Sequence, residues 1–333
     1  MMKSDKFIAV IIPTLNEERF ITDCLNSVLS QTYPIDRLDI MVVDGGSSDK
    51  TADIVQSFSE KYSNVRFLRN TKKIQSAAFN IGFKNTSASV IIRLDAHALY
   101  APNYIERCVN AIENDPQIGN VGGICNILPF TDRIVAEANA LLNTSRFGIG
   151  GATFRVGGKA GYVDTVPFGA FPRRTVEKLG GMREDLARGE DNEYNYRIRS
   201  AGYKVFFDPE IVSTYYSRPT LLSSMKQMFA NGLSIAKLLY IEKQIISIRH
   251  LVPLAFFLTL VILVVMSFVI KEFIVLLIGL LIIYLIAAFV SSAIICNKHG
   301  WRYFAILPIM FFLIHISYGY GTFVGLIKFS TNK

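Results

Sequence analysis

Short apolar runs alternate with mixed, helix-like stretches over the first 125 residues of the chain. The apolar runs have the length and composition of buried strands and read FIAVII, DIMVVD, NVRFLR, SVIIRLD and IGNVGGI. Helix-like stretches begin near Glu17, Asp49, Ile74 and Pro102. This alternation is typical of βαβ units, which build a mostly parallel sheet. The pattern therefore predicts an α/β fold.

The last quarter of the chain has a different pattern, with long apolar runs that carry almost no charge. Residues 251–270 contain no charged side chain over the length that a helix needs to cross a bilayer, and a second run covers residues 273–296. A third run, 304–327, contains Pro308, His315 and several glycines, which makes it a weaker spanning segment. We expect two or three transmembrane helices, and a buried helical hairpin is the alternative for the first two runs.

These patterns predict a globular domain over residues 1–220, interfacial amphipathic helices over 221–250 and a transmembrane region over 251–333. The middle segment mixes apolar faces with lysines, which suits the membrane interface, and an ordinary docking helix is the alternative. Positive charges precede the first apolar run and follow the second, so the positive-inside rule predicts an integral protein of the cytoplasmic membrane whose N-terminal domain faces the cytoplasm. Three spans would put the C-terminus outside, against which Lys328 and Lys333 argue.

Composition and charge narrow the class of partner. The net charge of +8 is spread over the whole chain, which suits an anionic membrane surface and not a nucleic-acid patch. The four cysteines lack the spacing of a metal site or a disulfide framework, so reduced thiols are expected. The opening residues MMKSDK lead directly into the first apolar run, and no signal peptide is expected.

Polar side chains follow the predicted strands, at the edge of a parallel sheet where ligands bind. After the first strand, Thr14 and Glu17 have the spacing of a capping box, and the start of the next helix offers free backbone N–H groups; capping alone is the alternative. Asp44 ends the second strand before two glycines, where its carboxylate can accept hydrogen bonds from a base or a ribose.

Asp95 and His97 follow the fourth strand in the string RLDAHA. At positions i and i+2 of an extended backbone, both side chains would point to the same side. A carboxylate and an imidazole placed in this way can bind a divalent cation that bridges two phosphates. A surface histidine, or one with satisfied hydrogen bonds, is the alternative for His97.

Five strings occur in an order that resembles the family 2 glycosyltransferases, which have the GT-A nucleotide-sugar-binding fold. They are PTLNE, VDGGSSDKT, NIGF, LDAHA and GEDNEYNYR. Within this family, DAHALYAPNYI and GGATFRVGGKAGYVDTVPFGAF resemble the succinoglycan-biosynthesis glucosyltransferase type. The resemblance covers about residues 7–232. It implies a GT-A fold with a mixed, mostly parallel sheet, followed by interfacial helices and C-terminal transmembrane helices.

The resemblance also implies a donor site for a UDP-sugar at the strand ends. Residues expected to contact the nucleotide are Pro13, Thr14, Leu15, Glu17, Asp44 and Asp95. Lys73, ahead of the third helix, is expected at the base or the diphosphate, with a solvated surface lysine as the alternative. Asp95 and His97 fall on the D-x-D motif of the family, which ligates Mg²⁺ or Mn²⁺. Histidine in the second place favours Mn²⁺ relative to a carboxylate.

On the acceptor side, the resemblance assigns Asp191 as the general base and Glu190 as its neighbour. A carboxylate is suited to this task because the acceptor hydroxyl must lose its proton as the new bond forms. Taken alone, the string EDNEYNYRIR is a polar first turn whose acids suit the helix dipole. Arg155, in a glycine-rich segment, is expected at a phosphate, and a surface linker is the alternative. Gln227 matches the glutamine of the Q-x-x-R-W motif of processive relatives, where it holds the acceptor or the diphosphate, but the arginine of that motif is absent here.

The sequence therefore predicts an inverting, metal-dependent glycosyltransferase that moves a hexose from a UDP-sugar to a polyprenyl-diphosphate-linked glycan. Such an enzyme would act in exopolysaccharide or cell-surface polysaccharide assembly, with membrane lipid and no nucleic acid among its partners. Two alternatives remain open. One is a polyprenyl-phosphate glycosyltransferase of the dolichol-phosphate-sugar synthase type, and the other is a catalytically silent membrane scaffold that binds a nucleotide sugar.

Overall fold

The chain forms two compact units in a computed structural model that describes residues 7–331. Unit 1 comprises residues 1–126 and 157–215, and unit 2 comprises residues 127–156 and 216–333. The expectation for the opening residues MMKSDK and the charge of Lys333 lie outside the described residues. The domain boundaries expected at residues 220 and 250 remain a prediction.

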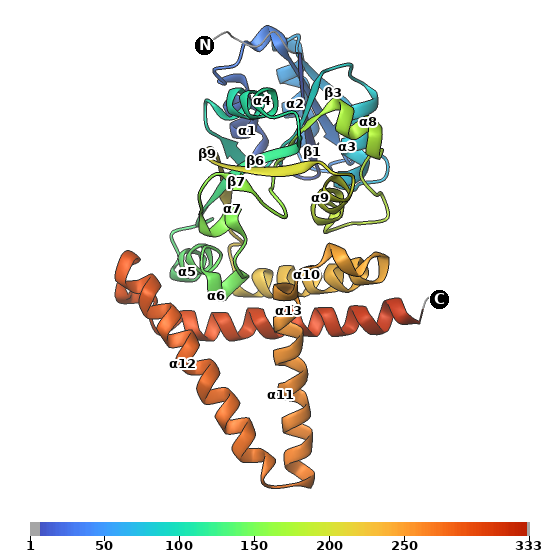
Figure 1. Cartoon of the computed structure of the whole chain (residues 1–333). Coiled ribbons are helices and arrows are strands. Elements are labelled where there is room, and N and C mark those ends of the chain that lie inside the picture. The colour runs from blue at the N-terminus through green and yellow to red at the C-terminus, as the bar shows by residue number, and fades with distance from the viewer. Residues whose placement is uncertain (1–6, 332–333) are drawn as a thin grey trace. The chain divides into compact units, whose positions relative to one another are not determined.

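Unit 1 holds the alternating strands and helices that the apolar pattern predicts (Figure 1). In chain order its elements are β1 (Ile8–Thr14), α1 (Ile21–Leu29), η1 (Ile35–Arg37), β2 (Leu38–Asp44), α2 (Thr51–Lys61), β3 (Val65–Arg69), α3 (Gln75–Lys84), β4 (Val90–Arg93), β5 (Ala98–Tyr100), α4 (Tyr104–Asn114), β6 (Ile118–Leu128), β7 (Gly161–Tyr162), β8 (Ala170–Pro172), α8 (Arg173–Leu179), α9 (Glu190–Ser200) and β9 (Lys204–Tyr216). Every residue of β1 and β2 is buried.

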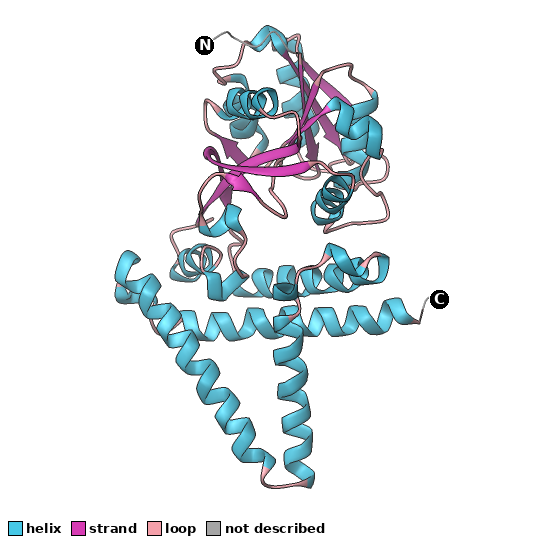
Figure 2. Ribbon diagram, in the orientation of Figure 1, coloured by secondary structure: helices cyan, strands magenta, loops and turns pink. Residues whose placement is uncertain are grey.

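The strands form one mixed sheet of nine strands in the order β3-β2-β1-β4-β8-β6-β9-β5, with β7 paired to β9 (Figure 2). The pairs β1–β2, β1–β4 and β2–β3 are parallel. Strand β8 is antiparallel to both β4 and β6. Strands β4 and β6 therefore run in the same direction, as βαβ alternation predicts, but a strand from much later in the chain is inserted between them.

The register of the parallel strands brings their carboxyl ends to one edge of the sheet. Thr14 at the end of β1 lies opposite Asp44 at the end of β2, and Asp44 lies opposite Arg69 of β3. On the other side of β1, Ile11 lies opposite Arg93, the last residue of β4. The loops that follow β1, β2 and β4 therefore begin side by side, which is the edge where α/β sheets bind ligands.

Unit 2 is helical (Figure 1). Its elements are α5 (Ile134–Leu142), α6 (Arg146–Ile149), α7 (Thr153–Val156), α10 (Leu221–Ile241), η2 (Lys243–Ile245), η3 (Ile248–His250), α11 (Val252–Val269), α12 (Phe273–His299), η4 (Trp301–Tyr303) and α13 (Leu307–Ser330). Within residues 7–331, three helical segments are long and apolar enough to cross a membrane: 248–269, 273–299 and 307–330.

The third of these segments differs from the other two in its packing. Helices α11 and α12 project together as a hairpin, whereas α13 runs across its base and lies beside α10 (Figure 1). A Cβ atom at Gly232 of α10 would lie 2.1 Å from the carbonyl oxygen of Tyr318, and one at Gly321 of α13 would lie 2.1 Å from that of Phe229. Glycine on both helices therefore permits backbone-to-backbone packing. In the most apolar stretch of each segment, the buried share is 6% for α11, 11% for α12 and 39% for α13.

Candidate active site

The loops that follow β1 and β2 are joined by hydrogen bonds. The Asn16 side-chain oxygen accepts from the backbone N–H of Ser48 at 2.8 Å, and the backbone N–H of Asn16 donates to the Ser47 hydroxyl at 2.8 Å. The backbone N–H of Glu17 donates to the Thr51 hydroxyl at 2.8 Å. Asn16 has a positive φ of 57°, a conformation that asparagine tolerates better than most residues. Much of the polar string after β1 therefore holds two strand ends together.

The predicted capping box of Thr14 and Glu17 is wrong. Helix α1 begins at Ile21, its N-cap residue is Phe20, and no side chain caps it. The Glu17 backbone carbonyl accepts from the N–H groups of Phe20 and Ile21, both at 2.9 Å. The Thr14 hydroxyl instead points to the Asp44 carboxylate at 3.4 Å, because the parallel register places the two residues opposite each other.

The Asp44 carboxylate organises the glycine turn after β2. Its Oδ2 accepts from the backbone N–H groups of Gly46 at 2.8 Å and Ser47 at 2.9 Å, and its Oδ1 accepts from the Ser47 hydroxyl. Asp44 is buried. A carboxylate that accepts several hydrogen bonds from its own loop keeps that loop in one shape.

Leu15 and Lys73 lie against the same glycine turn. A Cβ atom at Gly45 would lie 3.4 Å from Leu15 Cδ1 and 3.4 Å from Lys73 Cα. Lys73 has a positive φ of 58°, and its side chain is exposed at the start of α3. The structure thus brings the predicted nucleotide-contacting residues of three loops together, with Pro13 buried at the end of β1.

Asp95 and His97 lie in a turn, and the extended backbone predicted for them is wrong. The backbone N–H of Ala98 donates to the carbonyl of Asp95 at 3.3 Å, and the chain reverses to enter β5. The His97 Nδ1 lies 2.9 Å from Glu17 Oε1, which links the loop after β4 to the loop after β1. The buried Tyr100 hydroxyl accepts from the backbone N–H of Asp95 at 2.8 Å and fixes this turn.

Arg93, at the end of β4, joins Asp95 to the first turn of α9. Its Nη1 donates to both Asp191 oxygens, at 2.6 and 2.8 Å. Its Nη2 donates to Asp95 Oδ1 at 2.8 Å and to Gln75 Oε1 at 2.9 Å, and lies 3.7 Å from Glu190 Oε1. The Arg93 side chain is 3% exposed, whereas that of Asp191 is 36% exposed. One buried cation therefore faces three carboxylates, of which Asp191 is the accessible one.

Glu190 is a carboxylate with a strongly raised pKa. Burial, and after it the negative charge of Asp191, raise its pKa to about 7, although the nearby Arg93 guanidinium opposes the rise. The same carboxylates raise the pKa of Arg93, which stays charged despite its burial. Two adjacent acids at the start of α9 thus have different environments: Glu190 is enclosed, and Asp191 reaches solvent.

The raised pKa of Glu190 predicts a pH-dependent stability. The folded state binds the Glu190 proton more tightly than the unfolded state does, so this contribution is present below pH 4.5 and is lost as the pH rises to about 7. We expect a loss on the order of 3 kcal/mol over that window. In thermal unfolding followed by circular dichroism, we expect the wild type to lose stability between about pH 5 and about pH 8 and Glu190→Gln to show a flatter profile. Parallel pH profiles for the two proteins would contradict this assignment.

Hydrogen bonds and ion pairs therefore connect the loops of unit 1 that hold Asp44, Glu17, His97, Asp95 and Asp191. The Asp44 loop binds the loop of Asn16 and Glu17, Glu17 contacts His97, and Arg93 joins Asp95 to Asp191. The two remaining predicted residues belong to unit 2. Arg155 lies in α7 with its guanidinium 5.5 Å from the Phe154 ring centroid, and Gln227 is half-buried in α10.

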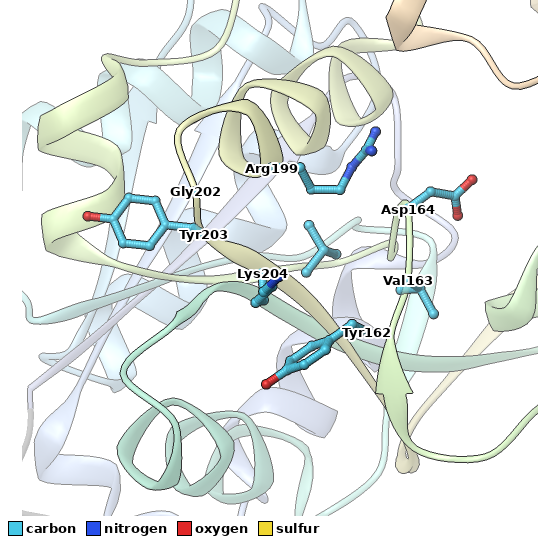
Figure 3. A pocket seen from close by; sticks show the side chains of 8 residues that line it. Tyr162, Val163, Asp164, Arg199, Gly202, Tyr203 and Lys204 are labelled. Atoms are coloured by element: carbon cyan, nitrogen blue, oxygen red, sulfur yellow. The ribbon is translucent and has the colours of Figure 1, made fainter.

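An open hollow of about 390 Å³ elsewhere in unit 1 contains none of these residues (Figure 3). It lies between β7 and the end of α9 and is lined by Tyr162, Val163, Asp164, Arg199, Gly202, Tyr203, Lys204 and Val205. Asp191 lies at the opposite end of α9. The hollow lacks the cluster of carboxylates and the interlocked loops, so we place the candidate site at the strand ends.

The sequence analysis missed Arg93 and Gln75. A signal for Arg93 was present, because it is the one charged residue inside the otherwise apolar string SVIIRL. A charge inside a buried strand must be paired, so an arginine there predicts acidic partners. The identity of those partners depends on α3 and α9, which are distant in sequence.

Comparison with known proteins shows the family. The family model for glycosyl transferase family 2 matches residues 9–179, and the chain belongs to this family. A Methanococcus voltae protein named dolichyl N-acetyl-alpha-D-glucosaminyl phosphate 3-beta-D-2,3-diacetamido-2,3-dideoxy-beta-D-glucuronosyltransferase is 32% identical, over 97% of this chain and 98% of that protein. The succinoglycan biosynthesis protein ExoA of Rhizobium meliloti is 28% identical, over 76% of this chain and 78% of its own.

Solved structures support the predicted fold. Mannosyltransferase PcManGT from Pyrobaculum calidifontis, in complex with GDP-Man and Mn²⁺, superposes with a TM-score of 0.60 at 19% identity, covering 94% of this chain and 86% of its own. S. aureus TarS 1–349 in complex with UDP-GlcNAc gives a TM-score of 0.51 at 16% identity, over 68% and 66% of the two chains. The predicted GT-A fold with C-terminal apolar helices is thereby confirmed.

Proposed function

We propose that the protein is an inverting, metal-dependent hexosyltransferase that transfers a sugar from a UDP-sugar to a sugar carried on a polyprenyl lipid. The observation that carries the proposal is the arrangement around Arg93, where an accessible carboxylate from α9 is held beside the strand-end loops of a GT-A domain. The name of the Methanococcus voltae relative, which describes transfer to a dolichyl sugar phosphate, supports a lipid-linked acceptor. Assembly of a cell-surface polysaccharide is the expected context.

Asp191 is the general base of this reaction. Its carboxylate takes the proton from the acceptor hydroxyl while the acceptor oxygen bonds to the anomeric carbon from the side opposite the nucleotide. The bond between the anomeric carbon and the phosphate oxygen breaks, and its electron pair leaves with the nucleoside diphosphate. Asp191 ends the step protonated, and the configuration at the anomeric carbon is inverted. An α-linked donor therefore gives a β-linked product.

Asp95 and His97 fit a divalent cation that also binds the diphosphate. Their side chains are 14% and 23% exposed, and Glu17, 18% exposed, lies against His97. Across residues 7–331, no three acidic, histidine or cysteine side chains form a ready metal cluster, so phosphate oxygens would complete the coordination. A carboxylate with an imidazole favours Mn²⁺ over Mg²⁺. When bound, the cation neutralises charge on the departing diphosphate.

The proposal is tested by UDP release from the purified full-length protein in detergent. A panel of UDP-sugars and GDP-mannose is supplied with native lipid extract and either Mn²⁺ or Mg²⁺. We expect release with one UDP-sugar only when glycosylated lipid is present, faster with Mn²⁺, and abolished by EDTA. His97→Asp should shift the preference toward Mg²⁺, because a carboxylate replaces the imidazole. Release that is unaffected by EDTA would contradict the metal role.

The same assay separates the two alternatives. Transfer to bare polyprenyl phosphate that survives in Asp191→Asn would indicate an enzyme of the dolichol-phosphate-sugar synthase type, for which a Pyrococcus furiosus relative, 32% identical over 39% of this chain, is a precedent. UDP binding with no release under any acceptor would indicate a silent scaffold. The solvent-reaching carboxylate that an arginine holds beside the strand ends supports the proposal over these two alternatives.

For the membrane, we expect α11 and α12 to span and the C-terminus to return to the cytoplasmic side. Lys237, Lys243 and Arg249 precede the α11–α12 hairpin and Lys298 and Arg302 follow it, whereas Lys271 and Glu272 balance each other at its tip. Helix α13 lies along α10 and crosses the base of the hairpin, which favours a position in the plane of the interface (Figure 1). Helix α10 covers one side of α13, so α13 can lie at the interface although it has no polar face.

Cysteine labelling in intact cells tests this topology. The native cysteines are buried, so new thiols dominate the signal. A membrane-impermeant maleimide should label Glu272→Cys from outside, and should label Thr331→Cys only after permeabilisation. Labelling of Thr331→Cys in intact cells would instead mean that three helices span. Detergent-solubilised samples provide the control that both thiols react.

A further inference from the structure

Arg93 contacts both Asp95, in the loop that follows β4, and the first turn of α9. It lies two positions before Asp95 and donates to Asp95 and to Asp191 through different nitrogens of the same guanidinium. The guanidinium is planar and rigid, so the two carboxylates are held at a separation that the arginine fixes. Gln75 at the start of α3 accepts from the same nitrogen as Asp95 and restrains the arginine from a third element.

We infer that Arg93 is a positioning residue that holds the Asp191 carboxylate toward the acceptor and ties it to the Asp95 loop that binds the donor. This inference rests on the proposed function of Asp191 as the base. Arg93 is itself enclosed, with 3% of its side chain exposed, so it acts through Asp191 and does not touch the substrates. Both oxygens of Asp191 contact the arginine, yet the side chain remains 36% exposed. This exposure is what a base needs in order to meet an acceptor hydroxyl.

A purely structural role explains the arrangement less well. A buried ion pair adds little to stability compared with apolar residues of similar volume, because both charges lose their hydration. Strand β4 is otherwise apolar, with Val90, Ile91 and Ile92 all buried, so an aliphatic side chain would fit its pattern. The cost of a buried charge with three acidic neighbours is understandable if their geometry serves the chemistry.

Turnover measured against donor affinity tests the role of Arg93. Arg93→Gln should lower kcat about 100-fold, because misplacement of a catalytic group by about 1 Å costs that much, while the Kd for UDP changes less than about threefold. Arg93→Lys keeps the charge but loses the fork of donors, so it should recover only part of kcat. If Arg93→Gln fails to fold, as shown by loss of its thermal unfolding transition, Arg93→Lys becomes the test, and an unchanged kcat in that variant overturns the inference. An Arg93→Gln protein that folds but no longer binds UDP also overturns it.

A double-mutant cycle with Asp191→Asn tests whether Arg93 acts through the base. If it does, Arg93→Gln should lower the residual kcat of Asp191→Asn by less than about threefold, far from the roughly 100-fold loss in the wild-type background. Losses that multiply would overturn the inference and leave the proposed function intact. Failure of the proposed function is recognised separately, because the wild type would then release no UDP, or Asp191→Asn would remain fully active.

Arg66→Gln is the matched control. Arg66 of β3 donates to Asp39 of β2 through two nitrogens, at 2.8 and 2.6 Å, within the same sheet. Loss of this ion pair should lower the thermal stability of the protein while kcat stays within about twofold of the wild type. A fall in kcat comparable to that of Arg93→Gln would show that any lost ion pair in the sheet disturbs catalysis, and would overturn the inference.

Discussion

Asp191→Asn should lower kcat about 1,000-fold and leave the Kd for UDP almost unchanged. Asparagine has the size of aspartate and can still accept a hydrogen bond from Arg93, but it cannot take a proton, and proton removal by a placed carboxylate contributes about 10²–10⁴-fold. Initial rates of UDP release give kcat, and isothermal titration gives the UDP affinity. An interaction that acts only during transfer lowers kcat and not ground-state binding.

Asp185→Asn is the control for this prediction. Asp185 is an exposed acid six positions earlier that contacts Arg183 at 2.9 Å, so the same chemical change there should leave kcat unaltered. Retention of more than about one tenth of wild-type kcat in Asp191→Asn would rule out its role as the base. Glu190, whose pKa lies near 7, would then become the acid to test.

Asp44→Ala should weaken UDP binding about 10- to 100-fold. The substitution removes an acceptor that holds the Gly46 and Ser47 N–H groups, so the turn after β2 loses its shape along with the carboxylate expected at the ribose. Hydrogen bonds to a charged group contribute about 1.5–3 kcal/mol, which corresponds to this range of affinity. Titration of UDP into the purified protein measures the change.

Two further variants separate the role of Asp44 from a general loss of charge. Asp44→Asn keeps one acceptor oxygen for the turn and should fall between the wild type and Asp44→Ala. Asp53→Asn removes an exposed acid from the following helix α2 and should bind UDP like the wild type. An unchanged Kd in Asp44→Ala would mean that the nucleotide does not contact the end of β2.

The strand ends could be predicted from the sequence because burial and the parallel register are local properties. Strands such as β1 and β2 are short, wholly buried, largely apolar and followed by polar turns, so their ends are visible in the string of residues. Thr14 and Asp44 then meet because parallel strands end at one edge. The family resemblance added the order of motifs that no single string supplies.

Contacts between distant segments could not be predicted in the same way. Strand β8 enters the sheet between β4 and β6 although it begins 42 residues after the end of β6, and nothing in its three residues indicates that position. The capping box failed because Asp44 competes for the Thr14 hydroxyl across the sheet. Arg93 was overlooked because its partners come from α3 and α9.

The C-terminal helices show a different limit. Hydropathy gives the length and apolar character of α13 but not the orientation of the helix relative to a membrane. A helix that packs lengthwise against α10 therefore has the same hydropathy profile as a transmembrane helix. Glycines at 232 and 321 were visible in the sequence, yet their role as points of close helix contact depends on which helix faces which. Residues 127–156 likewise join the C-terminal helices in unit 2, although they lie within the sequence of the globular domain.

A cryo-EM structure of the full-length protein with UDP and Mn²⁺ tests most directly whether the strand ends of unit 1 form one catalytic site. We predict that uridine lies against Thr14 and Asp44 and that density for the diphosphate and the metal lies beside Asp95 and His97. The Asp191 carboxylate should face the β-phosphate across the space that the donor sugar would occupy. Nucleotide density in the hollow beside Tyr162, or a metal bound away from Asp95, would contradict the account.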